Sequence, residues 1–429
     1  MMTSKIPIDL AGIGIGPFNL SLAALASQIK DLKVQFFERK INFEWHSEII
    51  FNDSYMQTSF LKDLVTGADP TNPYSFLNYL TQNGLFYSFM NTGRQSITRR
   101  EFELYCQWVS RELKDTLNFG SEIKSIQFED HHFLIESTQG IQQAKNICLG
   151  TGLIPRVPDC TKNFLGSKLF HAKSSDLASM DLTNQRVVII GGGQTGVEVF
   201  RNALKNHWGR AKSLQIVTSR ANLEPLDNSP FTNEYFTPHY VEQFYKLDPS
   251  AKGPITSYQK MASDGNTPEY LTDLYNDLYQ IKNIDRDERP IEILPYRRLE
   301  GVSTNHAVYD LKIQNRFYQK VENIQADIVI LATGFESVIP KLIEPIKHLV
   351  SFDLKGRFIF NEDFSIKWKG ELTNKIFALN FSRHGHGIAE PQTSLMAWRS
   401  ATVINSLTST SHFQTKNNVA NFINYGRLD

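Results

Sequence analysis

The sequence has few cysteines, and their placement excludes one kind of chemistry. Cys106, Cys148 and Cys160 are odd in number, widely spaced and form no CxxC motif. A chain with this pattern has neither a disulfide framework nor the paired thiols that a disulfide reductase needs. We therefore interpret each cysteine as a small buried apolar residue.

The sequence also lacks an excess of charge of either sign. Lys+Arg and Asp+Glu both number 45, so no overall field favours nucleic acid or an anionic membrane as a partner. No apolar run reaches the ~18 residues of a membrane span. The first residues, MMTSKIPIDL, do not contain the apolar core of a signal peptide. These absences predict a soluble cytoplasmic protein whose partners are small molecules.

Metal-binding patterns are equally scarce. The nearest approach is RHGHG, in which His384 and His386 are two residues apart. The motif itself contains no carboxylate or thiolate to complete a ligand set. We therefore expect no metal site.

What the chain does contain is an alternation of strand-like and helix-like segments, which is typical of α/β proteins. Its 429 residues suit two or three domains. An apolar strand runs into a glycine turn and a helix twice, in IDLAGIGIGPFNL (8–20) and in RVVIIGGGQTGVEVFR (186–201). A dinucleotide pyrophosphate needs such a turn, with backbone N–H groups and a helix N-terminus aimed at it. The sequence therefore predicts two dinucleotide-binding units.

The first turn has the features of a site for FAD. We expect Gly12 to permit the tight turn and Gly14 to permit close approach of the phosphates. Pro17 takes the place of the third glycine, directly after Gly16, and a proline is tolerated where it begins the helix. Glu38 ends the next strand, about 20 residues further on, where a carboxylate binds ribose hydroxyls.

The second turn has no such carboxylate. Its following strand, SLQIVTSR, ends in Ser219 and Arg220. A guanidinium pairs with the 2′-phosphate that distinguishes NADP(H), so NADPH is favoured over NADH. The alternative is that Arg220 is a solvated loop residue. The turn residues expected to contact the nucleotide are Gly191, Gly193, Gln194, Thr195 and Gly196.

Taken together, these segments predict an α/β fold with two Rossmann-like dinucleotide-binding domains, one for FAD and one for NADPH. We assign residues 1–160 and 335–429 to the FAD domain, and 161–222 and 286–334 to the NADPH domain. Residues 223–285 are richer in Asn, Asp, Pro and Tyr and break the alternation. We interpret them as a smaller, mainly helical substrate-binding insertion.

Other segments fit this plan. The turns CLGTG and LATGF match points where a chain passes between two nucleotide domains, and Thr333 and Gly334 of the second are expected to contact a cofactor. We expect a hairpin within 121–138 and a final helix over 386–407. FLGSKLFH is one residue longer than the FxGxxxH motif of flavin monooxygenases. The residues alone leave open an oxygen-using flavoenzyme or a non-catalytic flavin and NADP redox sensor.

Several longer stretches resemble the N-hydroxylating monooxygenases of siderophore biosynthesis, which act on lysine, ornithine or diamines. The similarity extends over nearly the whole chain, and the lysine N6-monooxygenase branch is the most similar. The stretches are GIGIGPFNLSLAAL, FEWH, YMQTSFLKDLVTGADPTNPYSFLNYL, GGGQTG, SPFTNEYFTP, LATGF and HGIAEPQTSLMAWRS.

The resemblance implies a reaction. NADPH would reduce FAD, O2 would add to form a C4a-hydroperoxyflavin, and the terminal primary amine of L-lysine, cadaverine or putrescine would attack it. The hydroxylamine formed would serve a hydroxamate siderophore. Ornithine and histamine remain alternative substrates. Only the neutral amine has a lone pair, and an alkylammonium titrates near ~10.4, so keeping it neutral near neutral pH costs about 4 kcal/mol.

The resemblance also implies roles for individual residues, none of them catalytic beyond the flavin itself. Gln57 would lie at the flavin, and Lys62 and Asn233 would bind the substrate. Trp45 and His46 would line the flavin, although Trp45 could equally be a core residue and Lys62 a surface ammonium. The residues expected where the final helix meets the flavin are Gly387 and Ser394. Relatives imply a homo-oligomer, a tetramer or a dimer. The second asparagine of the ornithine branch has no clear counterpart in MASDGNTPEY.

Overall fold

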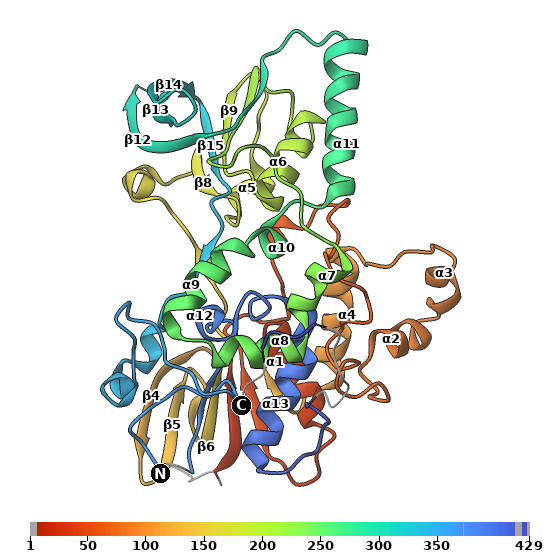
Figure 1. The fold of residues 1–429 in the computed structure, drawn as a ribbon, viewed down its shortest axis with the longest axis vertical. Helices are drawn as coiled ribbons and strands as arrows, with labels where there is room; N and C mark the ends of the chain where they lie inside the picture. The colour runs from red at the N-terminus through yellow and green to blue at the C-terminus, as the bar shows by residue number, and fades with distance from the viewer. Residues whose placement is uncertain (1–6, 307, 372, 417–422, 427–429) are drawn as a thin grey trace.

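The computed structural model describes residues 7–306, 308–371, 373–416 and 423–426. Residues 1–6 of MMTSKIPIDL, on which the signal-peptide prediction rests, lie outside these ranges. Figure 1 shows two α/β units, one above the other along the longest axis, with short helices between them. No helix in these described ranges is long and apolar enough to cross a membrane.

The lower unit in Figure 1 is built on a seven-stranded sheet with the order β3-β2-β1-β6-β5-β4, in which β17 also pairs with β6. The pairs among β3, β2, β1, β6 and β17 are parallel, whereas β4 and β5 form an antiparallel extension. The predicted hairpin is therefore present. The strands are β1 (Ile8–Ile13), β2 (Val34–Phe37), β3 (Leu117–Asn118), β4 (Ile123–Glu129), β5 (His132–Ser137), β6 (Gly140–Leu149) and β17 (Ile376–Ala378).

Helices cover this sheet and extend to its side. In particular, α1 packs against both α4 and α13. The helices of the lower unit are α1 (Pro17–Ala26), α2 (Phe76–Gln82), α3 (Phe86–Met90), α4 (Arg99–Glu112), α12 (Arg383–His386) and α13 (Met396–Thr408). The 3₁₀ segments are Ser47–Ile49, Lys341–Leu349 and Thr393–Leu395.

The upper unit has a five-stranded, wholly parallel sheet with the order β11-β10-β9-β15-β8. A separate antiparallel meander, β12-β13-β14, accompanies it. Two sheets, one wholly parallel and one parallel at its centre, each with a glycine turn after a central strand, confirm the predicted fold class. The elements are β8 (Leu169–His171), α5 (Asp176–Ser179), β9 (Arg186–Ile190), α6 (Gln194–Leu204), β10 (Ser213–Val217), β11 (Ile291–Leu294), β12 (Arg297–Asn305), β13 (Val308–Asn315), β14 (Lys320–Ala326) and β15 (Ile328–Leu331), with a 3₁₀ segment at Asp159–Phe164.

The chain crosses between the units along two short paired strands. β7 (Ile154–Pro155) leads out of the lower unit, and β16 (Phe335–Glu336) leads back antiparallel to it. The N–H of Arg156 donates to the carbonyl of Gly334 at 2.9 Å, which extends the pairing by one bond. The predicted turns CLGTG and LATGF therefore lie next to the two crossings.

The insertion over 223–285 is mainly helical, as predicted, but its helices pack in two directions. Val241 of α8 belongs to the core of the lower unit, and Leu274 of α11 belongs to the core of the upper unit. The short helix α10 lies between the two units (Figure 1). The helices are α7 (Pro230–Asn233), α8 (Pro238–Lys246), α9 (Pro249–Tyr258), α10 (Met261–Asp264) and α11 (Pro268–Tyr279). A 3₁₀ segment (Glu234–Phe236) follows α7, and a π-helical turn (Gln280–Ile284) follows α11.

The final helix differs from the prediction. It begins at Met396 instead of residue 386, because Gly387 has a left-handed φ of 85° and Pro391 cannot donate a helical hydrogen bond.

Candidate functional site: two open glycine turns

In the first glycine turn, between β1 and α1, the structural roles of the glycines differ from those predicted. Gly14 makes the turn with φ 86°, and a Cβ on it would lie 2.6 Å from the carbonyl oxygen of Gly150. A Cβ on Gly12 would lie 2.0 Å from the ring of Phe36. The prediction that Gly12 makes the tight turn is therefore wrong: Gly12 must be small because Phe36 packs on it.

Gly16 is the position that faces open space. No heavy atom lies within 4 Å of a Cβ built on it, and it begins α1 without a side-chain cap, with Pro17 as the first helical residue. A helix N-terminus with free N–H groups and room in front of it fits a phosphate. Glu38 supports the turn, because its Oε2 accepts from the N–H of Ile15 at 2.9 Å and its Oε1 from the N–H of Lys40 at 3.0 Å.

The second glycine turn, between β9 and α6, repeats this arrangement. Gly191 has φ 128°, and a Cβ on Gly196 would lie 1.9 Å from the carbonyl oxygen of Gly191, so both positions require glycine. Gly193 begins α6 without a side-chain cap. Among the described residues, the nearest heavy atom outside the turn to a Cβ on Gly193 is Arg220 Nη2, 3.9 Å away. The half-buried Gln194 and Thr195 follow at the start of the helix.

Arg220 extends from the end of β10 back toward this turn. Its Nη2 donates to the carbonyl of Asp264 at 2.8 Å, whereas its Nη1 is buried without a hydrogen-bond partner among the described residues. A buried donor without a partner is costly unless a ligand supplies an acceptor. Ser219 beside it is exposed. An open helix N-terminus and an unsatisfied guanidinium together fit a phosphorylated nucleotide.

Trp45 and His46 lie where the lower unit approaches the crossing strands. The Trp45 ring makes an edge-to-face contact with Phe102 at 5.0 Å, and its backbone N–H donates to Glu103 at 3.2 Å. His46 has a left-handed φ of 53°, and its ring lies 5.6 Å from that of Phe335. Burial, helped by neighbouring cations, lowers the pKa of His46 to about 3, so the imidazole is neutral near neutral pH.

The three residues expected to position the substrate are not joined to one another. Gln57 donates from Nε2 to the carbonyl of Gly265 at 3.2 Å. Lys62 is exposed as a residue, yet desolvation lowers the pKa of its ammonium group. Asn233 is exposed and donates to the side chain of Asn228 at 3.1 Å. In the part of the chain that the structure describes, no hydrogen bond links Lys62 to Asn233.

Near the start of α13, several buried polar atoms have no partner among the described residues. These atoms are Ser394 Oγ, Asn380 Oδ1 and Ser382 Oγ. The turn before them is fixed by a buried ion pair, in which Arg399 Nη1 lies 3.0 Å from Glu390 Oε1. Because native buried polar groups are normally satisfied, these unpaired oxygens fit a polar ligand such as a flavin.

His171, the histidine of FLGSKLFH, ends β8 of the upper unit and contacts the crossing strands. Nε2 of His171 lies 3.0 Å from the carbonyl oxygen of Gly334, and its ring lies 5.5 Å from that of Phe335. Burial is the main reason that the pKa of His171 is lowered. Thr333 donates from its hydroxyl to the carbonyl of Arg156. Both residues of the LATGF turn thus contribute to the joint between the units.

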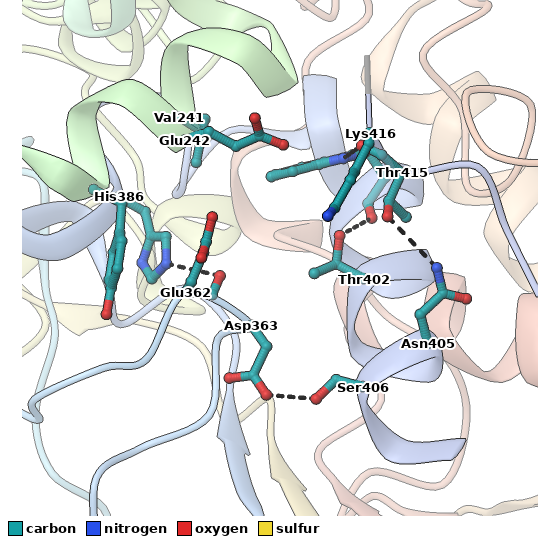
Figure 2. A pocket seen from close by; sticks show the side chains of 12 residues that line it. Val241, Glu242, Glu362, Asp363, His386, Thr402, Asn405, Ser406, Thr415 and Lys416 are labelled. Atoms are coloured by element: carbon teal, nitrogen blue, oxygen red, sulfur yellow. Dashed lines mark hydrogen bonds between the residues drawn. The ribbon is translucent and has the colours of Figure 1, made fainter. Parts of the chain in front are cut away.

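Figure 2 shows a separate cavity of about 260 Å³, in which α8 and α13 contribute opposite walls. Its polar contacts include His386 with the carbonyl of Glu362, and Asp363 with Ser406. None of the predicted substrate-binding or nucleotide-turn residues lines it. Within the described ranges no group of three potential ligands is placed to hold a metal ion.

Sequence reasoning missed four residues that hold these sites together. Asn19 is fully buried on α1 and donates to the carbonyl of Gly14 at 2.8 Å, and a polar residue in the apolar run PFNLSLAALA was a usable signal. Asn266, Glu198 and Arg99 had no local signal. Asn266 donates to the carbonyl of Gly192 at 3.0 Å, and Glu198 pairs with Arg99 at 2.9 Å.

Known proteins share both the sequence and this fold. The chain is 40% identical to the L-lysine N6-monooxygenase of Escherichia coli over 403 residues, or 94% of each chain. It is 31% identical to the putrescine N-hydroxylase of Acinetobacter baumannii, over 98% of this chain and 94% of that one. The crystal structure of DfoA, the FAD-bound cadaverine monooxygenase of Erwinia amylovora, matches with a TM-score of 0.92 and 25% identity, over 99% of this chain and 100% of that one.

The sequence profile of one family matches residues 7–337, which is most of the chain. That span contains both glycine turns, the Gln57–Lys62 segment and the helical insertion. The chain therefore belongs to the family of L-lysine 6-monooxygenases and L-ornithine 5-monooxygenases.

Proposed function

We propose that this monooxygenase uses FAD and NADPH to N-hydroxylate the terminal primary amine of L-lysine or of a related diamine, cadaverine or putrescine. The hydroxylamine would enter hydroxamate siderophore biosynthesis. The observation that carries the proposal is the pair of open helix N-termini at Gly16 and Gly193, each following a parallel strand in its own α/β unit. Family membership and the lysine and diamine relatives support the choice of substrates.

FAD would bind along the lower unit, from the first glycine turn to the start of α13. The Gly16 end of α1 would receive the pyrophosphate and Glu38 a ribose, because each presents the required N–H groups or carboxylate there. Bound FAD would supply the activation of O2 with electrons taken from NADPH. The residues proposed to hold it are Gly12, Gly14, Gly16, Pro17, Glu38, Trp45, His46, Gln57, Gly387 and Ser394.

NADPH would bind at the second turn, with Arg220 on its 2′-phosphate. The unpaired Nη1 of Arg220 supports this, because a phosphate oxygen would satisfy it with a charge-assisted hydrogen bond. The residues proposed to hold NADPH are Gly191, Gly193, Gln194, Thr195, Gly196, Ser219, Arg220, Thr333 and Gly334.

The amine substrate would bind between these sites, with no side chain acting as acid or base. Lys62 and Asn233 would hold the end remote from the reacting amine, and Gln57 would fix the geometry at the flavin. Exclusion of water disfavours the ammonium form, which leaves the reacting amine neutral. We keep the domain boundaries 1–160 with 335–429, 161–222 with 286–334, and 223–285.

We also propose a cytoplasmic homo-oligomer, a tetramer or a dimer. The described cysteines, Cys106, Cys148 and Cys160, are all free, as is usual for proteins of reducing compartments. Size-exclusion chromatography with light scattering would establish the assembly.

The deciding experiment measures hydroxylamine formed per NADPH consumed. The panel is L-lysine, cadaverine, putrescine, L-ornithine and histamine, each with the purified FAD-loaded protein. We expect L-lysine, cadaverine or putrescine to give the highest kcat/KM and near-stoichiometric hydroxylamine. If none of the amines stimulates NADPH oxidation or yields a hydroxylamine, the proposal fails in favour of a redox sensor.

A further inference from the structure

The segment Asp264–Thr267, at the end of α10, contacts both the second glycine turn and Gln57. The fully buried side chain of Asn266 donates from Nδ2 to the carbonyl of Gly192 and to that of Glu224, each at 3.0 Å. Gly192 is part of the second glycine turn, 74 residues away in the sequence. The shape of that turn therefore depends on a side chain from the helical insertion.

The hydrogen bond from Asn266 to the Gly192 carbonyl controls the direction of the N–H that follows, that of Gly193. In a planar trans peptide the carbonyl and the following N–H point in opposite directions. Because Asn266 holds the Gly192 carbonyl, the N–H of Gly193 is directed away from Asn266. That N–H has no backbone partner among the described residues, and the Cβ position of Gly193 has only Arg220 near it. Free N–H groups of this kind form the anion-binding concavities of phosphate sites.

The first turn contains an internal counterpart. Asn19, also fully buried, donates to the carbonyl of Gly14 at 2.8 Å, and the following N–H, that of Ile15, donates to Glu38 at 2.9 Å. Here the asparagine belongs to the helix that the turn begins. In the second turn the asparagine comes from a different part of the chain and holds the carbonyl directly before the N-cap residue Gly193.

The neighbouring Thr267 connects the second turn to Gln57, which is proposed to lie at the flavin. Its backbone N–H donates to Gln194 Oε1 at 2.8 Å, and its hydroxyl oxygen accepts from Gln57 Nε2 at 3.4 Å. Gln194 is fixed at its other end, where its Nε2 donates to Glu198 at 2.8 Å. Two glutamines, one from each proposed cofactor site, thus meet on one residue.

The segment has little freedom to move. A Cβ on Gly265 would lie 2.3 Å from Leu226 Cα, so its backbone is packed directly on that strand-like segment. The carbonyl of Asp264 accepts from Arg220, and the N–H of Leu226 donates to the carbonyl of Asn266 at 2.7 Å. A displacement at the nucleotide turn would therefore be passed to Gln57 instead of being absorbed.

The geometry points to Asn266 and Thr267 as positioning residues of the monooxygenase reaction. Asn266 sets the phosphate-binding form of the NADPH turn, and Thr267 keeps Gln57 in register with that turn. This inference rests on the proposed use of NADPH. It adds a role for the helical insertion, which would complete the NADPH site as well as bind substrate.

The first test separates the two turns in the FAD-loaded enzyme. Asn266→Ala should weaken NADP+ binding, measured by calorimetry, about tenfold or more, because the freed carbonyl no longer fixes the Gly193 N–H. Its flavin content should match wild type. The matched variant Asn19→Ala should do the reverse, lowering flavin content and leaving NADP+ affinity within about twofold. Equal loss of both cofactors in Asn266→Ala would overturn the inference, because it would indicate a general folding defect.

Hydrogen exchange makes the test independent of nucleotide binding. In nucleotide-free protein, amides of residues 189–197 should exchange about tenfold faster in Asn266→Ala than in wild type, while those of residues 8–20 are unchanged. Asn266→Asp, of the same shape but without the N–H donors, should behave alike and gives a second route if the alanine variant does not fold. Unchanged exchange over 189–197 in either variant would overturn the role of Asn266. If wild type bound no NADP+ at all, that would count against the proposed function alone.

The role of Thr267 has its own paired variants. Thr267→Val removes the hydroxyl that Gln57 contacts but keeps the N–H bonded to Gln194. It should leave NADP+ affinity and the rate of flavin reduction within about twofold of wild type, and lower the yield of hydroxylamine per NADPH about threefold or more. Thr267→Ser should restore the yield. A valine variant with wild-type yield would remove Thr267 from the connection.

Discussion

Arg99 of α4 and Glu198 of α6 form an ion pair between the two α/β units, with Nη1 and Oε2 2.9 Å apart. Glu198 is fully buried and also accepts from Gln194, which lies at the start of the same helix. Burial is the main reason that the pKa of Glu198 is raised, and it outweighs the attraction of Arg99. Burial of this pair between the units therefore carries a desolvation cost, which is offset only while both partners are present.

Removal of Arg99 should be strongly destabilising. Arg99→Met leaves the Glu198 carboxylate buried without its cation, and the free energy of unfolding at pH 8 should fall by about 3 to 5 kcal/mol. The raised pKa of Glu198 sets the pH dependence. Its protonated form is favoured in the folded state, so stability is retained below the unfolded pKa and lost as pH rises through the folded one. The defect of Arg99→Met should therefore be smaller at pH 5 than at pH 8.

Urea unfolding at both pH values checks this prediction, and Arg94→Met is the control. Arg94 pairs with Glu101 at 2.7 Å, but both side chains are partly exposed, so its loss should cost about 1 kcal/mol or less. The double variant Arg99→Met/Glu198→Met should recover most of the stability lost in Arg99→Met. Equal losses in the Arg99 and Arg94 variants would contradict the argument.

Gly16 provides the clean test of the FAD turn. Its φ of −89° and ψ of −178° are open to any residue, and the space around its Cβ is empty. Gly16→Val should therefore fold but place methyl groups where the pyrophosphate belongs, weakening FAD binding by about 2 to 3 kcal/mol, or roughly 30- to 150-fold. Gly14→Val is unsuitable, because its left-handed φ and the nearby Gly150 carbonyl would distort the fold itself.

Flavin absorbance per mole of protein and the Tm of the purified variants measure this effect. Gly253→Val serves as the control, since Gly253 is an exposed glycine that also has no atom near its Cβ. It should keep full flavin content. A Gly16→Val protein with the wild-type amount of flavin would remove Gly16 from the phosphate site.

Local patterns were sufficient to predict the two nucleotide turns but not their detailed roles. Strand, glycines and helix are adjacent in the sequence, so the turns follow from short-range constraints. The turn was assigned to Gly12 instead of Gly14 because the decisive neighbour of Gly12 is Phe36, on another strand. The start of α13 was misplaced because the apolar spacing of residues 386–395 resembles a helix, whereas Gly387 and Pro391 interrupt it.

The contacts that join the units could not be predicted in this way. Arg99 and Glu198 are 99 residues apart, and Asn266 and Gly192 are 74 apart. No periodicity connects such pairs, because their proximity depends on how the two sheets and the insertion are placed. The family resemblance predicted positioning roles for Gln57, Lys62 and Asn233, yet it gave no indication that Gln57 contacts the segment before α11.

Arg220 should determine the preference for NADPH. Arg220→Ala removes a charge-assisted contact with the 2′-phosphate, so the KM for NADPH should rise about tenfold or more while that for NADH changes little. Arg220→Lys should give an intermediate value, because an ammonium cannot form the paired hydrogen bonds of a guanidinium. Lys212→Ala, exposed at the other end of β10, is the control for charge alone. Equal effects on NADPH and NADH would show that Arg220 does not read the 2′-phosphate.

Lys62 gives a test of substrate class. If L-lysine is the substrate, Lys62→Ala leaves the substrate carboxylate without its partner, at a cost of about 2 to 4 kcal/mol or roughly 30- to 1,000-fold in kcat/KM. Flavin reduction by NADPH should stay near wild type, because Lys62 is not among the residues of the second turn. A diamine instead carries a second ammonium, which a lysine side chain repels. The same variant should then be neutral or better with putrescine and cadaverine.

The measurement is kcat/KM and hydroxylamine yield for L-lysine and both diamines, in wild type, Lys62→Ala and the surface variant Lys114→Ala. Desolvation lowers the pKa of Lys62, and a carboxylate that binds the ammonium group would raise that pKa again. Added L-lysine should therefore protect wild type, but not Lys62→Ala, against thermal unfolding. A variant that keeps wild-type kcat/KM for L-lysine would place Lys62 outside the site and leave a diamine as the better supported substrate.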